Sequence, residues 1–168
     1  MNQSNVYLSG FMGSGKTAIY NKIYPLVNAE HFDLDEEIIK KHGRIETIFE
    51  KGENHFRILE REEFSVIPNE NCLVALGGGS LEVQSIYIEV KASPNTFYLD
   101  DSFENLWERI KDSDRPLVKR GKDFALDRYQ YRKIFSRKLP NVIDMSKTTI
   151  SEAVEIIIES TWLKNERI

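Results

Sequence analysis

Near the start of the chain stands Gly10-Phe11-Met12-Gly13-Ser14-Gly15-Lys16-Thr17, which fits the pattern G-x-x-x-x-G-K-[ST]. Glycines let the backbone turn tightly and direct consecutive N–H groups at one point, where phosphate oxygens can accept from them. Lys16 is long enough to reach the β- and γ-phosphates of a nucleotide, and the Thr17 hydroxyl can ligate Mg²⁺. The motif predicts a nucleotide-phosphate site formed by Gly13, Ser14, Gly15, Lys16, Thr17 and Ala18.

The flanking sequence supports this interpretation. Val6-Tyr7-Leu8 is a short apolar run that enters the loop as a strand, and a helical pattern over 17–27 follows it. Such a helix presents the positive end of its dipole to a bound anion. The alternative is a glycine-rich turn that binds nothing, and it stays open at this point.

The rest of the chain alternates short apolar runs with helical patterns. Strands are predicted at Val6–Ser9, His31–Leu34, Cys72–Leu76, Thr96–Leu99 and Asn141–Asp144. Helices are predicted over 17–27, 36–42, 46–50, 53–67, 81–90, 103–111, 126–137 and 150–162. This alternation predicts an α/β fold of three layers, with a central five-stranded parallel sheet flanked by helices. Active sites of such folds lie beyond the carboxyl ends of the strands.

Length and composition limit the classes of protein that fit. A chain of 168 residues suits one domain, here 1–168, and 40% hydrophobic with 30% charged residues is typical of a globular protein. The formal net charge is −4 and no long basic stretch occurs, so we expect no nucleic-acid partner. No signal peptide and no apolar stretch of the ~18 residues that a membrane span needs is visible. We therefore expect a cytoplasmic monomer without a membrane partner.

One segment interrupts the alternation of strands and helices. The stretch 112–125 is polar, contains Pro116 and Gly121, and carries four basic side chains, Arg115, Lys119, Arg120 and Lys122. We predict a mobile basic loop that acts as a lid over bound phosphates. An ordinary solvated surface loop is the alternative.

Four further motifs follow the predicted strands or lie near them: Asp33-Leu34-Asp35, Phe56-Arg57-Ile58-Leu59-Glu60, Gly77-Gly78-Gly79 and Arg115-Pro116-Leu117-Val118. Together with the phosphate loop, in this order and spacing, they resemble the shikimate kinase family of P-loop proteins over roughly residues 5 to 160. The resemblance implies a P-loop kinase that transfers the γ-phosphoryl group of ATP to the 3-hydroxyl of shikimate, with Mg²⁺ as cofactor.

The resemblance also implies roles near the transferred phosphate. Lys16 and the lid residue Arg115 match groups that stabilise charge on the phosphoryl group. Asp35 matches the carboxylate that bonds the acceptor hydroxyl, which it could orient or deprotonate. Asp33 matches the family aspartate near the metal, acting with Thr17. Helix N-capping is the alternative for both aspartates.

A substrate carboxylate calls for bidentate cations. The resemblance assigns this task to Arg57, which Glu60 could hold in place from position i+3 on the same helix face. A plain surface ion pair is the alternative for these two residues. When the chain is aligned with the family pattern backwards from the last predicted strand, Asn141–Asp144, Arg132 falls at the position of the second carboxylate-binding arginine. Arg128 is the alternative for this role.

Two more assignments concern the rings of the substrates. Backbone amides of Gly77, Gly78 and Gly79 would approach the shikimate ring, unless the glycines form a plain strand-to-helix turn. Arg109 matches a residue that stacks on the adenine face, and its alternative is a solvated helix residue.

The chain departs from the family pattern at several positions, among them Leu76, Ser136 and Pro140. Leu76 stands where the family carries Thr, and Ser136 stands where a Tyr is common. These departures keep a degenerate nucleotide-binding paralogue as one alternative. A gluconate-kinase-like enzyme is a second. A small GTPase is a third, but no Asn-Lys-x-Asp motif follows a predicted strand.

Overall fold

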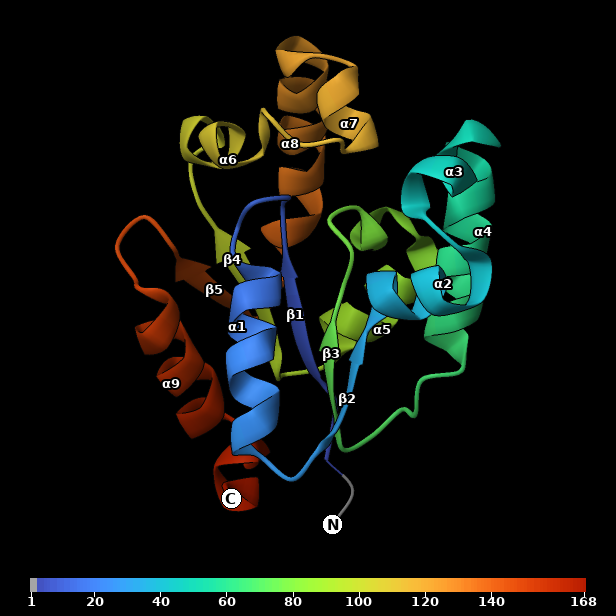
Figure 1. Cartoon of the computed structure of the whole chain (residues 1–168). Helices are drawn as coiled ribbons and strands as arrows, with labels where there is room; N and C mark the ends of the chain where they lie inside the picture. The colour runs from blue at the N-terminus through green and yellow to red at the C-terminus, as the bar shows by residue number, and fades with distance from the viewer. Residues whose placement is uncertain (1–2) are drawn as a thin grey trace.

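A computed structural model describes residues 3–168 and has a five-stranded sheet in the order β2-β3-β1-β4-β5, in which every neighbouring pair is parallel (Figure 1). The strands are β1 (Val6–Gly10), β2 (Glu30–Asp33), β3 (Cys72–Ala75), β4 (Thr96–Asp100) and β5 (Asn141–Asp144). Helices cover both faces of the sheet, so the predicted three-layer α/β fold is confirmed.

Figure 1 shows how the helices are distributed around the sheet. One face is covered by α1 (Lys16–Ile23) and α9 (Ile150–Ser160). The other is covered by α2 (Leu34–His42), α3 (Ile45–Glu50), α4 (Glu53–Ser65) and α5 (Gln84–Ala92). Beyond the carboxyl ends of the strands lie α6 (Phe103–Ile110), α7 (Pro116–Lys119) and α8 (Lys122–Ser136). Short 3₁₀ helices complete the fold at η1 (Tyr24–Leu26), η2 (Ser80–Glu82) and η3 (Trp162–Glu166).

Strand β1 shows why its sequence lacks an alternating pattern. Val6 and Leu8 pack into the core beneath α1 and α9, whereas Tyr7 points to the opposite core beneath α2, α4 and α5. All of β1 is buried. A central parallel strand is covered on both faces and is therefore apolar throughout.

A third apolar cluster ties the phosphate loop to the helices beyond the sheet. Phe11 of the loop packs with residues from α6, α7 and α8, namely Phe103, Leu106, Ile110, Leu117 and Ala125. Its ring also makes an edge-on contact with Tyr129, at 5.5 Å between centroids. This packing fixes the loop against the segment that was predicted to be a lid.

The prediction of an irregular loop over 112–125 is wrong in part. Pro116 begins α7 at its first turn, where a missing N–H costs nothing, and Gly121 at φ 94° precedes α8. Helix α8 therefore starts four residues before the predicted position, because the proline and glycine serve here as helix boundaries. Within residues 3–168, no helix combines the length and apolarity needed to cross a membrane.

Candidate active site

The phosphate loop has the backbone conformation that its glycines predict. Gly13 and Gly15 adopt φ of 82° and 99°, and Gly15 is the residue from which α1 begins. A Cβ on Gly13 would lie 2.9 Å from the Ile110 side chain, so a larger residue is excluded by space as well as by φ. Ser14 is buried, whereas Thr17 and Ala18 lie exposed in the first turn of α1.

Lys16 is folded onto its own loop. Its Nζ donates to the backbone oxygens of Gly10 at 2.5 Å and Phe11 at 3.1 Å. Burial lowers the pKa of Lys16 to about 8, with Arg115 and Arg132 acting in the same direction and Asp35 opposing them. The charged residues that act on the pKa of Lys16 are thus residues that the sequence analysis assigned to the active site.

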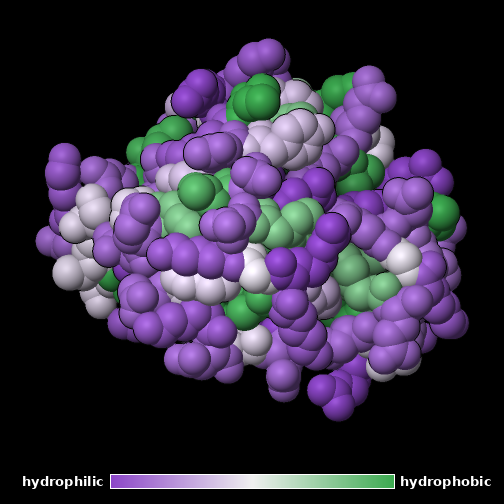
Figure 2. Space-filling view, turned by 90° about the horizontal axis from the view of Figure 1, so that it is seen from above, coloured by the Kyte–Doolittle hydropathy of each residue, from purple (hydrophilic) through white to green (hydrophobic). Residues whose placement is uncertain are grey.

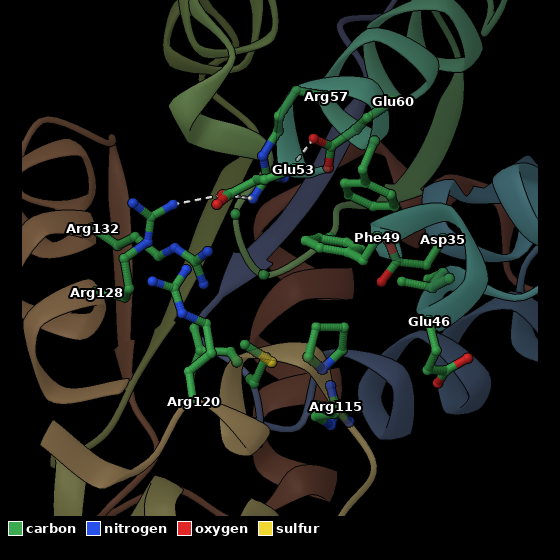
Figure 3. A pocket seen from close by; sticks show the side chains of 18 of the residues that line it. Asp35, Glu46, Phe49, Glu53, Arg57, Glu60, Arg115, Arg120, Arg128 and Arg132 are labelled. Atoms are coloured by element: carbon green, nitrogen blue, oxygen red, sulfur yellow. Dashed lines mark hydrogen bonds and ion pairs between the residues drawn. The ribbon is translucent and has the colours of Figure 1, made fainter. Parts of the chain in front are cut away.

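Asp33 and Asp35 stand at the start of α2 and differ in role. Asp33 caps the helix, since its Oδ1 accepts from the Glu36 N–H at 3.1 Å, and its role near a metal stays a prediction. Asp35 instead faces the cavity next to Gly77, where an added Cβ would lie 2.8 Å from its Oδ1 (Figure 3). Burial, with Glu60 and Asp33 as further causes, raises the pKa of Asp35 to about 6.

A cavity of about 550 Å³ lies beyond the carboxyl ends of the strands. Seen from above, this end of the molecule is mainly hydrophilic, and apolar side chains show mostly in its recesses (Figure 2). Figure 3 shows acidic and aromatic side chains from α2, α3 and α4 facing arginines that flank α7 or lie on α8. The lining includes Asp35, Glu46, Phe49, Glu53, Arg57, Glu60, Gly77, Gly78, Gly79, Arg115, Arg120, Arg128 and Arg132.

Two guanidinium groups meet at Gly79. A Cβ there would clash with Nη2 of Arg57 and come within 2.6 Å of Nη2 of Arg132. Arg57 donates through Nη1 to Glu60 at 2.7 Å, and Glu60 is fully buried and also accepts from Ser80 at 2.5 Å. The surface ion-pair alternative for Arg57 and Glu60 is therefore wrong, because this pair lies inside the site.

Arg132 and Arg128 differ in what their donors do. Arg132 is 7% exposed, and its buried Nη1 has no hydrogen-bond partner within residues 3–168. Nη2 of Arg128 donates at 2.7 Å to both Glu53 and Glu82. Arg57 and Arg132 therefore meet at Gly79, and Arg132 has a buried donor without a partner within residues 3–168, so Arg132 rather than Arg128 stays our candidate for the second carboxylate-binding arginine. Arg57 and Arg132, with the charged residues paired to them, are called the arginine clamp below.

The remaining predicted arginines border the same region. Arg115 precedes α7 in the cavity wall, close enough to influence the pKa of both Lys16 and Asp35. Arg109 donates to the backbone oxygen of Gly13 at 2.9 Å and to the buried Asp101 at 2.8 Å. The half-exposed Arg109 guanidinium is therefore fixed against the phosphate loop.

Sequence reasoning missed Glu53 and Glu82, which interact with the arginines of the clamp. Their acidic character alone gave no signal, since 30% of the chain is charged. Of the departures from the family pattern, Leu76 is buried in the apolar core, and Ser136 is buried and donates to the Lys133 carbonyl at 3.0 Å. The lost hydroxyl at 76 is thus replaced by packing.

No group of three or more His, Cys, Asp or Glu side chains in residues 3–168 is arranged to hold a metal ion. The oxygen groups near the phosphate loop include the exposed Thr17 hydroxyl and the Asp33 carboxylate. Asp33 lies close enough to Lys16 for each charge to act on the other group: Asp33 raises the pKa of Lys16, and Lys16 lowers the pKa of Asp33. A hydroxyl and a carboxylate are the donor chemistry that Mg²⁺ accepts when phosphates and waters supply the remaining ligands.

Comparison with known proteins identifies the family. The family model "Shikimate kinase" matches residues 12–162. A shikimate kinase of Sulfurihydrogenibium sp. (strain YO3AOP1) is 36% identical over 158 residues, which is 92% of this chain and 95% of that protein. A shikimate kinase of Aquifex aeolicus (strain VF5) is 38% identical over 137 residues, 79% of this chain and 82% of that protein.

A solved structure agrees with this result. Shikimate kinase from Acinetobacter baumannii in complex with shikimate has a TM-score of 0.79 and 26% identity, covering 95% of this chain and 96% of that chain. The gluconate-kinase-like alternative is not favoured by these matches. The resemblance drawn from the sequence motifs is confirmed, and the chain belongs to the shikimate kinase family.

Proposed function

We propose that this protein transfers the γ-phosphoryl group of ATP to the 3-hydroxyl of shikimate, the step that produces shikimate 3-phosphate for aromatic amino-acid biosynthesis. One observation carries the proposal. The same cavity presents a pair of arginines at Gly79 and a carboxylate, Asp35, at Gly77. A small ring with a carboxylate at one position and a hydroxyl at another complements that arrangement.

The arginine pair would bind the substrate carboxylate. Nε of Arg57 and Nη1 of Arg132 are buried and have no hydrogen-bond partner within residues 3–168. A buried donor without a partner costs free energy, which a carboxylate acceptor would recover. Backbone amides of Gly77, Gly78 and Gly79 lie along the same wall, where the absence of side chains lets the ring approach.

Asp35 would position the acceptor hydroxyl. With a pKa of about 6 it is mainly ionised at neutral pH and accepts a hydrogen bond from the 3-hydroxyl. A base with its pKa near the working pH can also take the proton as the new P–O bond forms. The raised pKa therefore suits either orientation or proton transfer.

Lys16 and Arg115 would stabilise the transferred group. Negative charge spreads over three phosphoryl oxygens in the transition state, and fixed cations beside them lower its free energy. Lys16 would exchange its two carbonyl acceptors for phosphate oxygens. Arg115 would approach from the lid, and Arg109, held against Gly13, would contact the adenine face of the nucleotide.

Thr17 and Asp33 would hold Mg²⁺, with Asp33 acting through water. The ion supplies charge neutralisation on the β- and γ-phosphates. The cap that Asp33 forms uses Oδ1, which keeps its carboxylate fixed at the start of α2. That the whole chain is a single domain acting as a cytoplasmic monomer stays a prediction, as does the lid role of 112–125.

The test is an assay of ADP release with ATP, Mg²⁺ and shikimate, with phosphorus NMR of the product. We expect ADP formation that depends on shikimate, and one new phosphate ester at the 3-position. Gluconate serves as the control acceptor and should give no turnover. Turnover with gluconate alone would overturn the proposal, and ADP binding without any turnover would identify a degenerate paralogue.

A further inference from the structure

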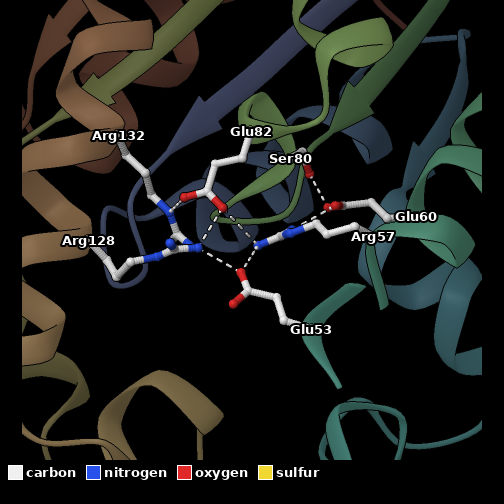
Figure 4. A network of polar contacts seen from close by, with 7 residues as sticks. All are labelled: Glu53, Arg57, Glu60, Ser80, Glu82, Arg128 and Arg132. Carbon is white, nitrogen blue, oxygen red and sulfur yellow. Dashed lines mark hydrogen bonds and ion pairs between the residues drawn. The ribbon is translucent and has the colours of Figure 1, made fainter. Parts of the chain in front are cut away.

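The arginine clamp already contains carboxylates of the protein itself (Figure 4). Glu82 lies at the end of η2, directly after the triple-glycine turn. Its Oε1 accepts from Nε of Arg132 at 3.0 Å, and its Oε2 accepts from Nη2 of Arg128 at 2.7 Å and of Arg57 at 3.5 Å. Glu82 thus contacts all three arginines of the network.

Like charges explain why an internal anion is needed there. Arg57 and Arg132 approach the same glycine, so their guanidinium groups repel each other across a partly desolvated space. Burial lowers the pKa of Arg132, while the Glu82 carboxylate favours its charged form. Without Glu82, the free energy of keeping Arg132 charged and in place would rise.

The role of Glu82 follows from the donors of Arg132 that it does not engage. Glu82 accepts a hydrogen bond from Nε of Arg132, whereas Nη1 of Arg132 has no partner within residues 3–168. A guanidinium held at its Nε edge presents its remaining edge in a fixed direction, which favours bidentate binding of a carboxylate. The side chain of Glu82 is 10% exposed and therefore restricted by packing.

We propose that Glu82 is a positioning residue for the substrate carboxylate, holding Arg132 by its Nε so that both Nη groups face the cavity. This assignment rests on the proposed function, because it takes the carboxylate of shikimate as the ligand of the clamp. The opposite model makes Glu82 a competitor that the substrate must displace. The two models predict opposite changes in shikimate affinity when the charge of Glu82 is removed.

The experiment measures steady-state kinetics and shikimate binding for Glu82→Gln. Glutamine keeps the shape and one acceptor oxygen but removes the charge. We expect the KM and Kd for shikimate to rise roughly 5- to 30-fold, as expected when a contact of one or two kcal/mol is lost. The kcat and the KM for ATP should change less than about 2-fold, because Glu82 touches neither the phosphate loop nor Asp35.

Glu62→Gln is the matched control. Glu62 lies exposed on α4 and forms no ion pair within the described residues 3–168, so its substitution removes the same charge without touching the clamp. Glu82→Asp is the second variant. Aspartate keeps the negative charge, but its side chain is one methylene shorter, so the hydrogen bond to Nε of Arg132 should be lost and the KM for shikimate should also rise.

A double variant shows whether Glu82 acts through Arg132. If it does, Glu82→Gln should add little to the shikimate KM of Arg132→Lys. A fall in KM for Glu82→Gln, additive effects in the double variant, or a parallel loss of kcat, ATP affinity and thermal stability would each overturn the assignment. Failure of the unmodified protein to bind shikimate would instead overturn the proposed function, and this assignment with it.

Discussion

The phosphate loop and the arginine clamp adjoin one another, with the Arg132 guanidinium 5.4 Å from the centre of the Phe11 ring, and are built in different ways. The loop is a contiguous segment, residues 10–18, whose shape comes from backbone dihedral angles at Gly13 and Gly15. The clamp joins side chains from α4, η2 and α8, of which Arg57 and Arg132 are far apart in the chain. Its shape comes from ion pairs among six charged residues, Glu53, Arg57, Glu60, Glu82, Arg128 and Arg132.

This difference predicts how substitutions act. In the proposed function, the loop and its lysine stabilise the charge that is redistributed over the phosphoryl group in the transition state, so changes there should reduce kcat. The clamp would bind a carboxylate that does not change during the reaction, so changes there should mainly raise the substrate KM. Asp35 stands between the two regions and should affect the chemical step.

The largest effect should come from the loop. Lys16→Ala removes the ammonium beside the transferring phosphate, and we expect kcat to fall by roughly 10³-fold or more. Circular dichroism should show an intact fold. Lys22→Ala, on the same helix but exposed, is the control and should keep normal turnover. Turnover of Lys16→Ala near the unmodified level would refute the assignment of the phosphate loop.

Asp35→Asn should have the next largest effect. The amide keeps the shape but loses the negative acceptor, so kcat should fall by roughly 10²-fold while the KM for ATP hardly moves. Collapse of ATP binding with normal residual turnover would mean a metal-linked role instead.

The same variant should also be more stable at neutral pH. The folded-state pKa of Asp35 is raised, so the free energy of unfolding falls, and the folded state loses stability, as pH rises through about 6 and this carboxylate ionises. Asparagine removes that cost. Calorimetry at pH 7.5 should show Tm higher by roughly 5 °C, and the gain should vanish near pH 4. An equal gain at both pH values would mean that ionisation of Asp35 is not its cause.

The loop could be predicted from sequence because its determinants are local. Strand, glycine turn and helix follow one another, and Lys16 and Thr17 occupy fixed positions in that unit. The clamp could be predicted only as far as Arg57, its partner Glu60, and Arg132. The bridging roles of Glu53 and Glu82 depend on how α4, η2 and α8 pack, which no spacing along the chain reveals. The helical turn at Pro116 was missed because α7 has only four residues, too few for a periodic pattern.

The clamp itself is tested by arginine substitutions. Arg57→Ala and Arg132→Ala should each raise the KM for shikimate by roughly 10- to 100-fold, since each loses a charge-assisted hydrogen bond of about 1.5–3 kcal/mol. The double variant should lose less than the sum of the two. Arg128→Ala is the control and should have less than about 3-fold effect, because Glu53 and Glu82 already occupy its Nη2. A large effect at Arg128 with none at Arg132 would exchange their roles.

The dependence of kcat/KM on pH should separate the role of Asp35 from that of Lys16. Activity should fall below about pH 6 as Asp35 takes up a proton, and above about pH 8 as Lys16 loses one. Bound phosphate favours the charged amine, so the alkaline limb should move to higher pH in kcat. Asp35→Asn should abolish the acidic limb only. An acidic limb that survives in this variant would belong to another group.

The smallest effect concerns the segment 112–125, which connects loop and clamp. Leu117 and Ala125 anchor this segment in the apolar cluster around Phe11, while Arg115 has no ion-pair partner in the described part of the chain. Bound phosphate would give Arg115 that partner, so α7 should become more ordered when both substrate sites are filled.

Amide hydrogen exchange over 112–125 should slow by roughly 3- to 10-fold with ADP and shikimate together, and less with either alone. The last turns of α9, residues 155–160, are not part of the cavity lining and serve as the internal reference, and Arg115→Ala should remove most of the protection. Equal exchange rates with and without ligands would mean that residues 112–125 do not close over the bound substrates, and the proposed lid role would be wrong.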